Sequence, residues 1–342
     1  MALGRVVLVT GVSSDLGGRL ACRLAEAPGV ERVIGVDVAP GHRHLDGVDF
    51  VRADIRNPVI ATVVAGQTVD TVVHMSVQAA QGRGGQGRTP TKEHNVIGTM
   101  QLLAACQKAP GLERLVVRSS AAGYGSSSRD PARFTEDMAA RSVPRSGFGK
   151  DVLEVEGYVR GFSRRRPDVT VTTLRPAHLI GSRTESPLSD YFSLPVVPTP
   201  FGFDARLQLL HENDLLAAME HATIQGTHGT FNVAGDGIVM LSQALRRLGR
   251  PTIALPSLAL AGLRSVLGPA GVSGPDRELA AYLTFGCGLD TRQMREVLGF
   301  VPEHSTASAF AEYARSSGPG RVSMPRAPQS TASAAEAGAV RG

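Results

Sequence analysis

The chain has 342 residues, of which 42% are hydrophobic and 20% charged, and its formal net charge is +5. This balance is typical of a globular protein with a sizeable core, and the length allows one large domain or two. The basic residues are scattered apart from a triplet at 164–166, with no stripe of them interleaved with aromatics, so the sequence argues against a nucleic-acid partner. An anionic small molecule accounts for the charge equally well.

No segment points to a membrane or to an oxidising compartment. The most apolar late stretch, residues 253–267, is interrupted by Pro256 and is too short to cross a bilayer. The chain enters a strand at once, so we expect no signal peptide and a cytoplasmic location. The cysteines, Cys22, Cys106 and Cys287, are widely spaced, which fits neither a disulfide framework nor a metal-binding pattern. We therefore expect reduced thiols and no metal site.

The first strand and the turn after it carry the clearest signal. Residues 6–9 form a β-branched apolar run suited to a strand buried on both faces, and helical spacing begins around Gly17 and Gly18. A helix opened by a glycine-rich turn directs backbone N–H groups and its positive dipole end at that turn, where a pyrophosphate can bind. The candidate cofactor-binding residues here are Gly11, Ser13, Ser14, Asp15, Leu16 and Gly17.

The second strand indicates which dinucleotide binds. Residues 33–36 follow at βαβ distance and end in Asp37, whose carboxylate can accept hydrogen bonds from the adenosine ribose of NAD. The same carboxylate would repel the extra phosphate of NADP. Arg43 is near enough in sequence to favour that phosphate, but the position of Asp37 favours NAD.

A third strand, expected over residues 48–54, supplies a candidate for the adenine. It ends in Asp54, which could receive the adenine amino group, with Ile55 beside the ring. Asp54 could equally cap a helix that follows Pro58, and the sequence leaves both interpretations open.

The fourth strand, expected over residues 71–75, brings His74 and Met75 to its carboxyl end. Ligands bind outside the strand ends of such sheets, so we expect both residues to lie close to the cofactor's pyrophosphate. Residues 78–91, which are rich in Gly, Gln and Arg and lack apolar periodicity, are expected to form a surface loop.

Strands and helices continue to alternate through the first half of the chain. Helices are expected at 95–107 and 150–160, and strands at 114–117 and 169–174. This alternation predicts an α/β fold with a Rossmann-type, doubly wound parallel sheet over residues 1–185. A strand and a helix near 206–235 are expected to return to that domain.

Beyond residue 185 the alternation breaks. Residues 186–203 hold four prolines and are expected to be irregular. Strands are expected at 207–211 and 230–233, and helices at 214–221, 241–248, 258–267 and 277–283, the first of them capped by Asp214. We expect 186–205 and 236–315 to form a smaller, mostly helical substrate-binding region, and 316–342 to be a disordered tail.

Taken in this order, the residues resemble the extended short-chain dehydrogenase/reductases of the NAD-dependent epimerase/dehydratase family, in particular UDP-galactose and UDP-glucose epimerases. The resemblance covers residues 5–315, and its carriers are Thr10-Gly11 with Gly17, Asp37, Asp54-Ile55, His74, residues 95–99, residues 119–125, Lys150 with Glu154, Arg175-Pro176 and Leu298-Gly299-Phe300. It implies an NAD-dependent oxidoreductase that acts on a nucleotide-linked sugar, an anionic small molecule. It also implies Asn95, Lys150 and Arg175 at the cofactor and Ser120 beside the substrate.

The sequence departs from the family pattern at three positions. Ser14 stands where the cofactor turn carries its middle glycine, and a serine forced into a positive φ there would cost about 1 kcal/mol. His178 stands where several relatives have a substrate-facing Asn. The family's catalytic pair is a Tyr four residues before a Lys, and here the Lys matches Lys150 while the Tyr position holds Ser146.

The loss of the Tyr bears directly on catalysis. Hydride transfer at a sugar carbon needs a proton moved from or to the attached oxygen, and losing such a general acid/base costs about 10²–10⁴ in rate. A serine at position 146 lacks the acidity and the reach of a phenol. Tyr124 and His178 are the candidate substitutes, and Ser146→Tyr is expected to rebuild the family's arrangement beside Lys150.

Two functions remain open at this stage. The first is an epimerase-like enzyme in which Arg206, if it is not merely a surface charge, helps to bind the anionic diphosphate of the substrate. The second is an NAD(P)-binding protein with little or no catalysis, a sensor or assembly partner. Relatives often dimerise through their two long helices, so a homodimer through 95–107 and 150–160 is a further expectation.

Overall fold

A computed structural model of the chain describes residues 4–79, 88–141, 143–144, 146–267 and 274–317. Its main feature is a seven-stranded, wholly parallel sheet in the order β11-β6-β5-β4-β1-β2-β3. The strands are β1 (Arg5–Thr10), β2 (Val30–Asp37), β3 (Val48–Arg52), β4 (Thr71–His74), β5 (Arg114–Arg118), β6 (Thr170–Pro176) and β11 (Gly229–Val233). The strand order reverses between β1 and β4, which is where such sheets bind ligands. The predicted Rossmann-type fold is confirmed.

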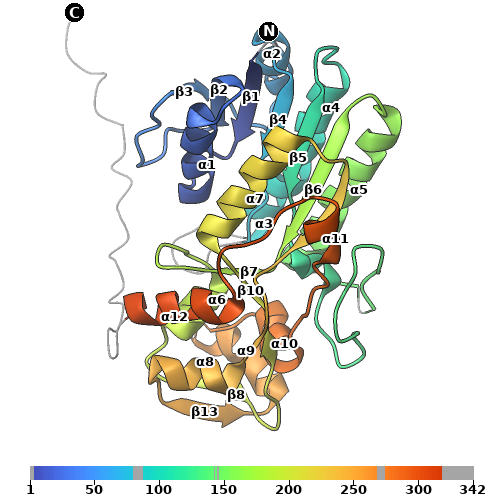
Figure 1. Cartoon of the computed structure of the whole chain (residues 1–342). Coiled ribbons are helices and arrows are strands. Elements are labelled where there is room, and N and C mark those ends of the chain that lie inside the picture. The colour runs from blue at the N-terminus through green and yellow to red at the C-terminus, as the bar shows by residue number, and fades with distance from the viewer. Residues whose placement is uncertain (1–3, 80–87, 142, 145, 268–273, 318–342) are drawn as a thin grey trace, which may run out of the picture.

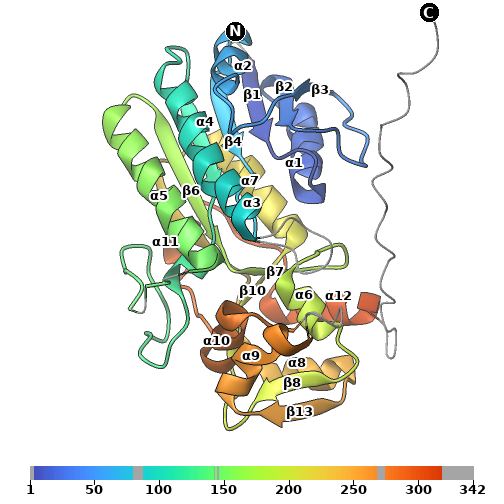
Figure 2. The same cartoon turned by 180° about the vertical axis from the view of Figure 1, so that it is seen from behind.

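Helices cover both faces of the sheet, because alternate residues of each strand pack in opposite directions. Val7 and Val9 join one core cluster with α1 (Asp15–Glu26), α7 (Glu212–Gln225) and α11 (Arg292–Glu296). Leu8 joins a second cluster with α2 (Ile60–Gly66), α4 (Gly98–Gln107) and α5 (Phe148–Arg165). Helices α1 and α7 lie toward the viewer in Figure 1, and α4 and α5 do so in Figure 2.

A third core cluster builds a smaller lobe below the sheet in Figure 1. Its aromatic centre includes Phe192 and Phe310, whose rings lie 5.3 Å apart and edge-on. The lobe's helices are α6 (Pro187–Phe192), α8 (Leu241–Leu248), α9 (Ser257–Leu267), α10 (Arg277–Phe285) and α12 (Thr306–Ser317). Its paired strands are β8 (Val197–Pro200) with β13 (Thr252–Leu255), and β9 (Arg206–Leu207) with β12 (Val239–Met240).

Short elements join the lobe to the sheet. Strand β7 (His178–Ile180) pairs in parallel with β10 (Leu209–His211). A 3₁₀ turn (Ala121–Tyr124) follows β5, and α3 (Arg88–Lys92) runs through a π-helical turn (Glu93–Ile97) into α4. No described helix combines the length and hydropathy of a membrane span.

The expectation of an irregular segment at 186–203 was wrong. Ser186 and Ser189 form a capping box at the start of α6, and Pro187 occupies the first turn, where its missing N–H costs nothing. Pro198 and Pro200 lie on β8, which among the described strands pairs with β13 alone, so both prolines sit on an edge strand that tolerates them.

Other boundaries shifted by a few residues. The helix expected from Asp214 begins at Glu212, because the side chain of His211 caps it by accepting from Asn213 N at 3.2 Å. Part of the loop expected at 78–91 is helical from Arg88 onward, and residues 80–87 lie outside the described part of the chain. The predicted disordered tail begins at residue 316, but residues 316 and 317 form the end of α12. The rest of the tail lies outside the described part of the chain. The homodimer remains a prediction.

Candidate functional site

The β1–α1 turn is a tight cradle built by two glycines and a serine. Gly11 has φ +79°, and a Cβ at Gly17 would lie 2.1 Å from the Gly11 carbonyl oxygen, so neither position accepts a side chain. Ser14 has φ −74° and caps α1: its Oγ accepts from Gly17 N at 3.1 Å and donates to the Gly11 carbonyl at 2.7 Å. The strain expected from a serine in place of glycine is therefore absent, because the position is extended and the hydroxyl works as an N-cap.

The surroundings of this turn fit a dinucleotide. Asp37, at the end of β2, lies beside the turn and accepts from Ser13 N at 3.0 Å. The buried Ser76 Oγ has no hydrogen-bond partner and would lie 2.9 Å from a Cβ at Gly11. A buried hydroxyl without a partner costs free energy, so an acceptor or donor from a ligand at the turn would satisfy it. NAD, if bound, would place its pyrophosphate at the turn and its adenosine toward Asp37.

A cavity of about 980 Å³ connects this turn to the small lobe. At the turn it is lined by Ser13, Ser14, Asp15 and Leu16, and at the far end by Leu279 and Tyr282 of α10. Between them lie Ser120, Phe148 and His178. Of the residues predicted from the sequence, Ser13, Ser14, Asp15, Leu16, Ser120 and His178 thus share one cavity.

Hydrogen bonds around the end of β5 fix the position of Ser120. It caps the 3₁₀ turn after β5, with its Oγ accepting from Ala122 N at 3.1 Å, which leaves the hydroxyl proton for a ligand. The neighbouring Ser119 Oγ donates to Glu156 Oε1 at 2.6 Å, and the same carboxylate receives two bonds from Arg175, at 2.8 and 2.7 Å. Arg175 therefore supports the end of β5 instead of lining the cavity.

The hydroxyl of Tyr124 is engaged in a buried hydrogen-bond network. Its hydroxyl donates to Asn232 Oδ1 at 2.8 Å and accepts from Arg175 Nη1 at 2.7 Å, and its ring stacks on Phe134. Burial raises the pKa of Tyr124 to about 12, so the phenol keeps its proton at neutral pH. Neither the position nor the acidity of this hydroxyl supports Tyr124 as the substitute for the family's Tyr.

Ser146 and Lys150 do not form a pair one helical turn apart. Helix α5 starts at Phe148, with Gly147 as its N-cap at φ +84°, so Ser146 precedes the helix, and its side chain is exposed. Lys150 Nζ lies 3.6 Å from Glu154 Oε1 and does not line the cavity, whereas Phe148 does. The expectation that Lys150 lies one helical turn after position 146 is therefore not met, because the helix begins only at Phe148.

His178 is the titratable side chain of β7 that faces the cavity. Its ring centroid lies 4.0 Å from that of Tyr282. Burial lowers the pKa of His178 to about 4, with Asp276 acting in the opposite direction, so the imidazole is neutral at physiological pH. A neutral imidazole can accept a hydrogen bond or a proton from a substrate hydroxyl.

The remaining predicted residues lie outside the cavity lining. His74 is buried and bridges Thr10 and Thr99, with 2.8 Å to each hydroxyl, and burial lowers its pKa to about 3. Asn95 holds the backbone of Gln78, which does line the cavity, through bonds of 3.1 and 2.8 Å. Met75 is fully buried in the core.

Asp54 does not cap α2, whose N-cap is Val59, but forms an ion pair with Arg56 at 2.7 Å. Ile55 is buried against Gly98. Their adenine role stays a prediction. Arg206 is exposed and away from the cavity, as a surface charge would be.

Arg118 is the main cavity residue that the sequence analysis missed. It ends β5, directly before Ser119, and its buried Nε has no hydrogen-bond partner. A cation at the carboxyl end of an apolar strand was a visible signal, since such ends meet the ligand in parallel sheets.

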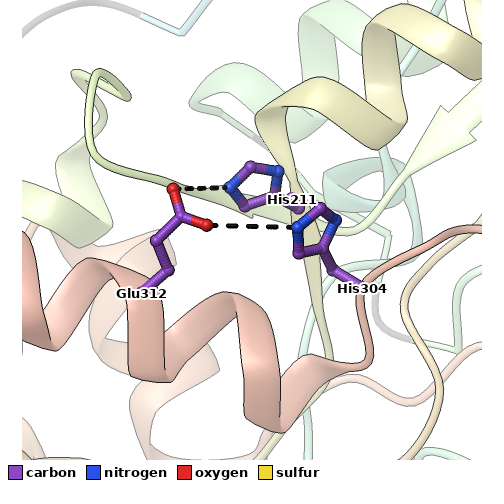
Figure 3. A group of neighbouring side chains, drawn as sticks. All are labelled: His211, His304 and Glu312. Carbon is purple, nitrogen blue, oxygen red and sulfur yellow. Dashed lines mark ion pairs between the residues drawn. The ribbon is translucent and has the colours of Figure 1, made fainter.

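A separate cluster joins β10 to the lobe (Figure 3). His211 Nε2 lies 3.3 Å from Glu312 Oε1, and His304 stacks on His211 while its Nδ1 lies 3.1 Å from Asp214 Oδ2. The three side chains are close enough to hold a metal ion. However, His211 Nδ1 accepts from Asn213 N, which places the ring proton on Nε2, and a protonated nitrogen cannot ligate. Glu312 of α12 thus lies within ion-pair distance of both imidazoles, and the cluster brings the start of α7 next to α12.

Comparisons with known proteins found a matching family and similar folds. A sequence profile of the NAD dependent epimerase/dehydratase family matches residues 7–194. An uncharacterised protein of Mycobacterium tuberculosis is 49% identical over 318 residues, which cover 92% of this chain and 84% of that protein. The crystal structure of UDP-glucose 4-epimerase from Thermotoga maritima with UDP-glucose is similar with a TM-score of 0.69 at 18% identity, covering 91% of this chain and 98% of that one. The dTDP-glucose 4,6-dehydratase of Bacillus anthracis in complex with NAD gives 0.67 at 18%, covering 91% and 96%.

Proposed function

The chain belongs to the NAD-dependent epimerase/dehydratase family, so NAD is its cofactor as predicted, and from that premise we propose that it oxidises or epimerises a nucleotide-linked sugar. The observation that carries the proposal is that one cavity joins the β1–α1 turn to Ser120, His178 and the small lobe. A dinucleotide bound at one end would leave the other end for a second ligand. The lobe contributes apolar walls there through Leu279 and Tyr282.

Two side chains of this protein are placed to act on the sugar. Ser120 is fixed by its bond to Ala122 N and can donate its proton to a substrate oxygen. His178 is neutral, so it can accept a hydrogen bond from the reacting hydroxyl and take its proton during the reaction. NAD supplies the hydride acceptor for such chemistry. Because burial has lowered the pKa of His178 to about 4, it is a weaker base than a tuned phenol, and we expect slow turnover.

The experiment is to add UDP-glucose, UDP-galactose, UDP-glucuronate and dTDP-glucose to the NAD-loaded protein. Reduction of the cofactor is followed by its near-ultraviolet absorbance, and epimers by chromatography. His178→Asn is expected to lower turnover by about 10²-fold or more, the scale of a lost acid/base, whereas Ser126→Ala, at another cavity residue, should not. Equal turnover in the His178 variant would remove that residue from the chemistry.

A second candidate function is a cofactor-binding protein with little turnover. It is favoured by the position of Ser146 outside the cavity and by the full hydrogen bonding of the Tyr124 hydroxyl, which leave the site without the family's phenol. This candidate predicts NAD binding with no cofactor reduction and no epimer from any of the four nucleotide sugars.

A further inference from the structure

Arg118 is a cation that lines the cavity and has no anionic partner among the described residues. It lines the cavity at the end of β5, and its Nε is buried and has no hydrogen-bond partner. No carboxylate among the described residues lies within ion-pair distance of its guanidinium. Burial lowers the pKa of Arg118 to about 10, so the side chain still carries its charge at neutral pH.

Two other arginines on the same sheet, by contrast, have hydrogen-bond partners that compensate their positive charge. Arg175, on the neighbouring strand β6, makes two bonds to the Glu156 carboxylate. Arg114, at the opposite end of β5, donates to the carbonyl oxygens of Thr223 and Ile224 at the end of α7. Arg118 is half-buried, and the lack of a partner for its buried Nε is costly, so a ligand group that pairs with the guanidinium would be favoured.

The position of Arg118 indicates which ligand group that is. In the sheet, β4 lies between β1 and β5, so the end of β5 is about 10 Å from the β1 turn at the usual strand spacing. The turn's own N–H groups and the α1 dipole serve a pyrophosphate there. With the adenosine of a dinucleotide directed toward Asp37 on β2, its nicotinamide half lies on the other side of β1, toward Ser120. Arg118 therefore belongs to the reacting end of the cavity.

A positive side chain at that end has an electrostatic consequence. The oxidised nicotinamide ring is itself positive, and two positive charges in a poorly hydrated cavity repel each other. An anionic group on the substrate would remove this repulsion and satisfy the guanidinium, whose planar fork matches a carboxylate. We propose that Arg118 binds a carboxylate on the sugar of the substrate, so that the substrate class is a nucleotide-linked uronic acid. This inference rests on the proposed function of the same cavity.

The test compares UDP-glucuronate with UDP-glucose, two ligands that differ by the carboxylate, in calorimetric titrations of the NAD-loaded protein. The wild type is expected to bind UDP-glucuronate about 10- to 100-fold more tightly, the worth of one hydrogen bond between charged groups. Arg118→Gln should abolish that preference and leave the affinity for UDP-glucose unchanged. It should not weaken NAD, because it removes a charge that repels the nicotinamide ring. The matched control is Arg183→Gln, which removes an exposed cation of the same cavity and should keep the preference.

The following results would overturn the proposal. Equal affinity of the wild type for the two sugars would show that no carboxylate is recognised. If Arg118→Gln weakened both sugars equally, Arg118 would serve the nucleotide diphosphate, and if it weakened NAD, it would serve the cofactor's phosphates. If neither UDP-sugar bound the wild type, the proposed function itself would fail. Free D-glucuronate against D-glucose in a thermal-shift assay then decides the Arg118 site: stabilisation by glucuronate alone, lost in Arg118→Gln, supports it, and no shift refutes it.

Discussion

Among the groups that support the site, we expect the carboxylate of Glu156 to contribute most to the stability of the fold. The side chains of Glu156 and Arg175 are 5% and 13% exposed, and Glu156 also accepts from the Ser119 hydroxyl at 2.6 Å. Glu156→Gln keeps the volume but removes the charge and one acceptor oxygen, which leaves the guanidinium of Arg175 buried with neutral partners. Breaking a buried ion pair from one side typically costs about 3–5 kcal/mol, and we expect the free energy of unfolding to fall by that amount.

The assay is unfolding in a chemical denaturant, followed by circular dichroism, with a matched control on the same helix. Glu154 also pairs with cations, Lys150 at 3.6 Å and Lys92 at 3.8 Å, but its side chain is 33% exposed. Water screens such a pair, so Glu154→Gln should cost only about 0–1 kcal/mol. Losses of equal size in the two variants, or a loss under about 1 kcal/mol for Glu156→Gln, would refute the argument that burial makes this ion pair critical.

The remaining predictions concern the cofactor, the acid/base position and pH. Asp37→Ala is expected to weaken NAD by about 1.5–3 kcal/mol in calorimetry, and unchanged affinity would remove Asp37 from the cofactor site. Ser146→Ala should leave any turnover unchanged, since the side chain is exposed and outside the cavity, and a drop of about 10²-fold would contradict this. His74 has a folded pKa of about 3 and an unfolded value near 6.5. The unfolded state therefore binds the extra proton, and stability should fall as pH drops from about 6.5 toward 3, by up to about 1.4 kcal/mol per pH unit. His74→Gln should flatten that slope in denaturant midpoints measured across the range.

The fold could be predicted because its signals are local and repeated. A run such as 6–9 is apolar and mostly β-branched, which is typical of a strand buried on both faces, and the structure places Val7 and Leu8 in different core clusters. The segment 186–203 misled for a physical reason. Prolines indicate irregular chain when read alone, but they also suit the first turn of a helix and an edge strand, and the structure uses them in both ways.

The site was only partly predictable. The side chains of the cofactor turn are held by residues close to them in sequence, whereas those at the reacting end of the cavity are held by residues far away in sequence. Ser14 caps α1 within three residues of its partner, whereas the partners of Tyr124 are Asn232 and Arg175. No spacing in the sequence shows that a buried network occupies that hydroxyl. That Arg118 Nε lacks a hydrogen-bond partner could not be predicted either, because it depends on which groups lie near it in the folded chain.

The Tyr position gives the sharpest contrast between spacing and geometry. Four residues separate Ser146 from Lys150, which inside a helix would place both on one face. The helix begins two residues after Ser146, at Phe148, and the Glu278 carboxylate accepts from Gly149 N at 3.0 Å, which fixes that start. Gly147 holds φ +84°, so the chain turns between Ser146 and the helix. Ser146→Tyr is therefore expected to add a ring on the exposed loop and no hydride transfer, with NAD affinity unchanged, in the same absorbance assay with nucleotide sugars. Cofactor reduction by that variant alone would contradict this expectation. It would show that the loop can join the helix and displace Glu278. The residue at 146, and not the contact with Glu278, would then set the start of α5.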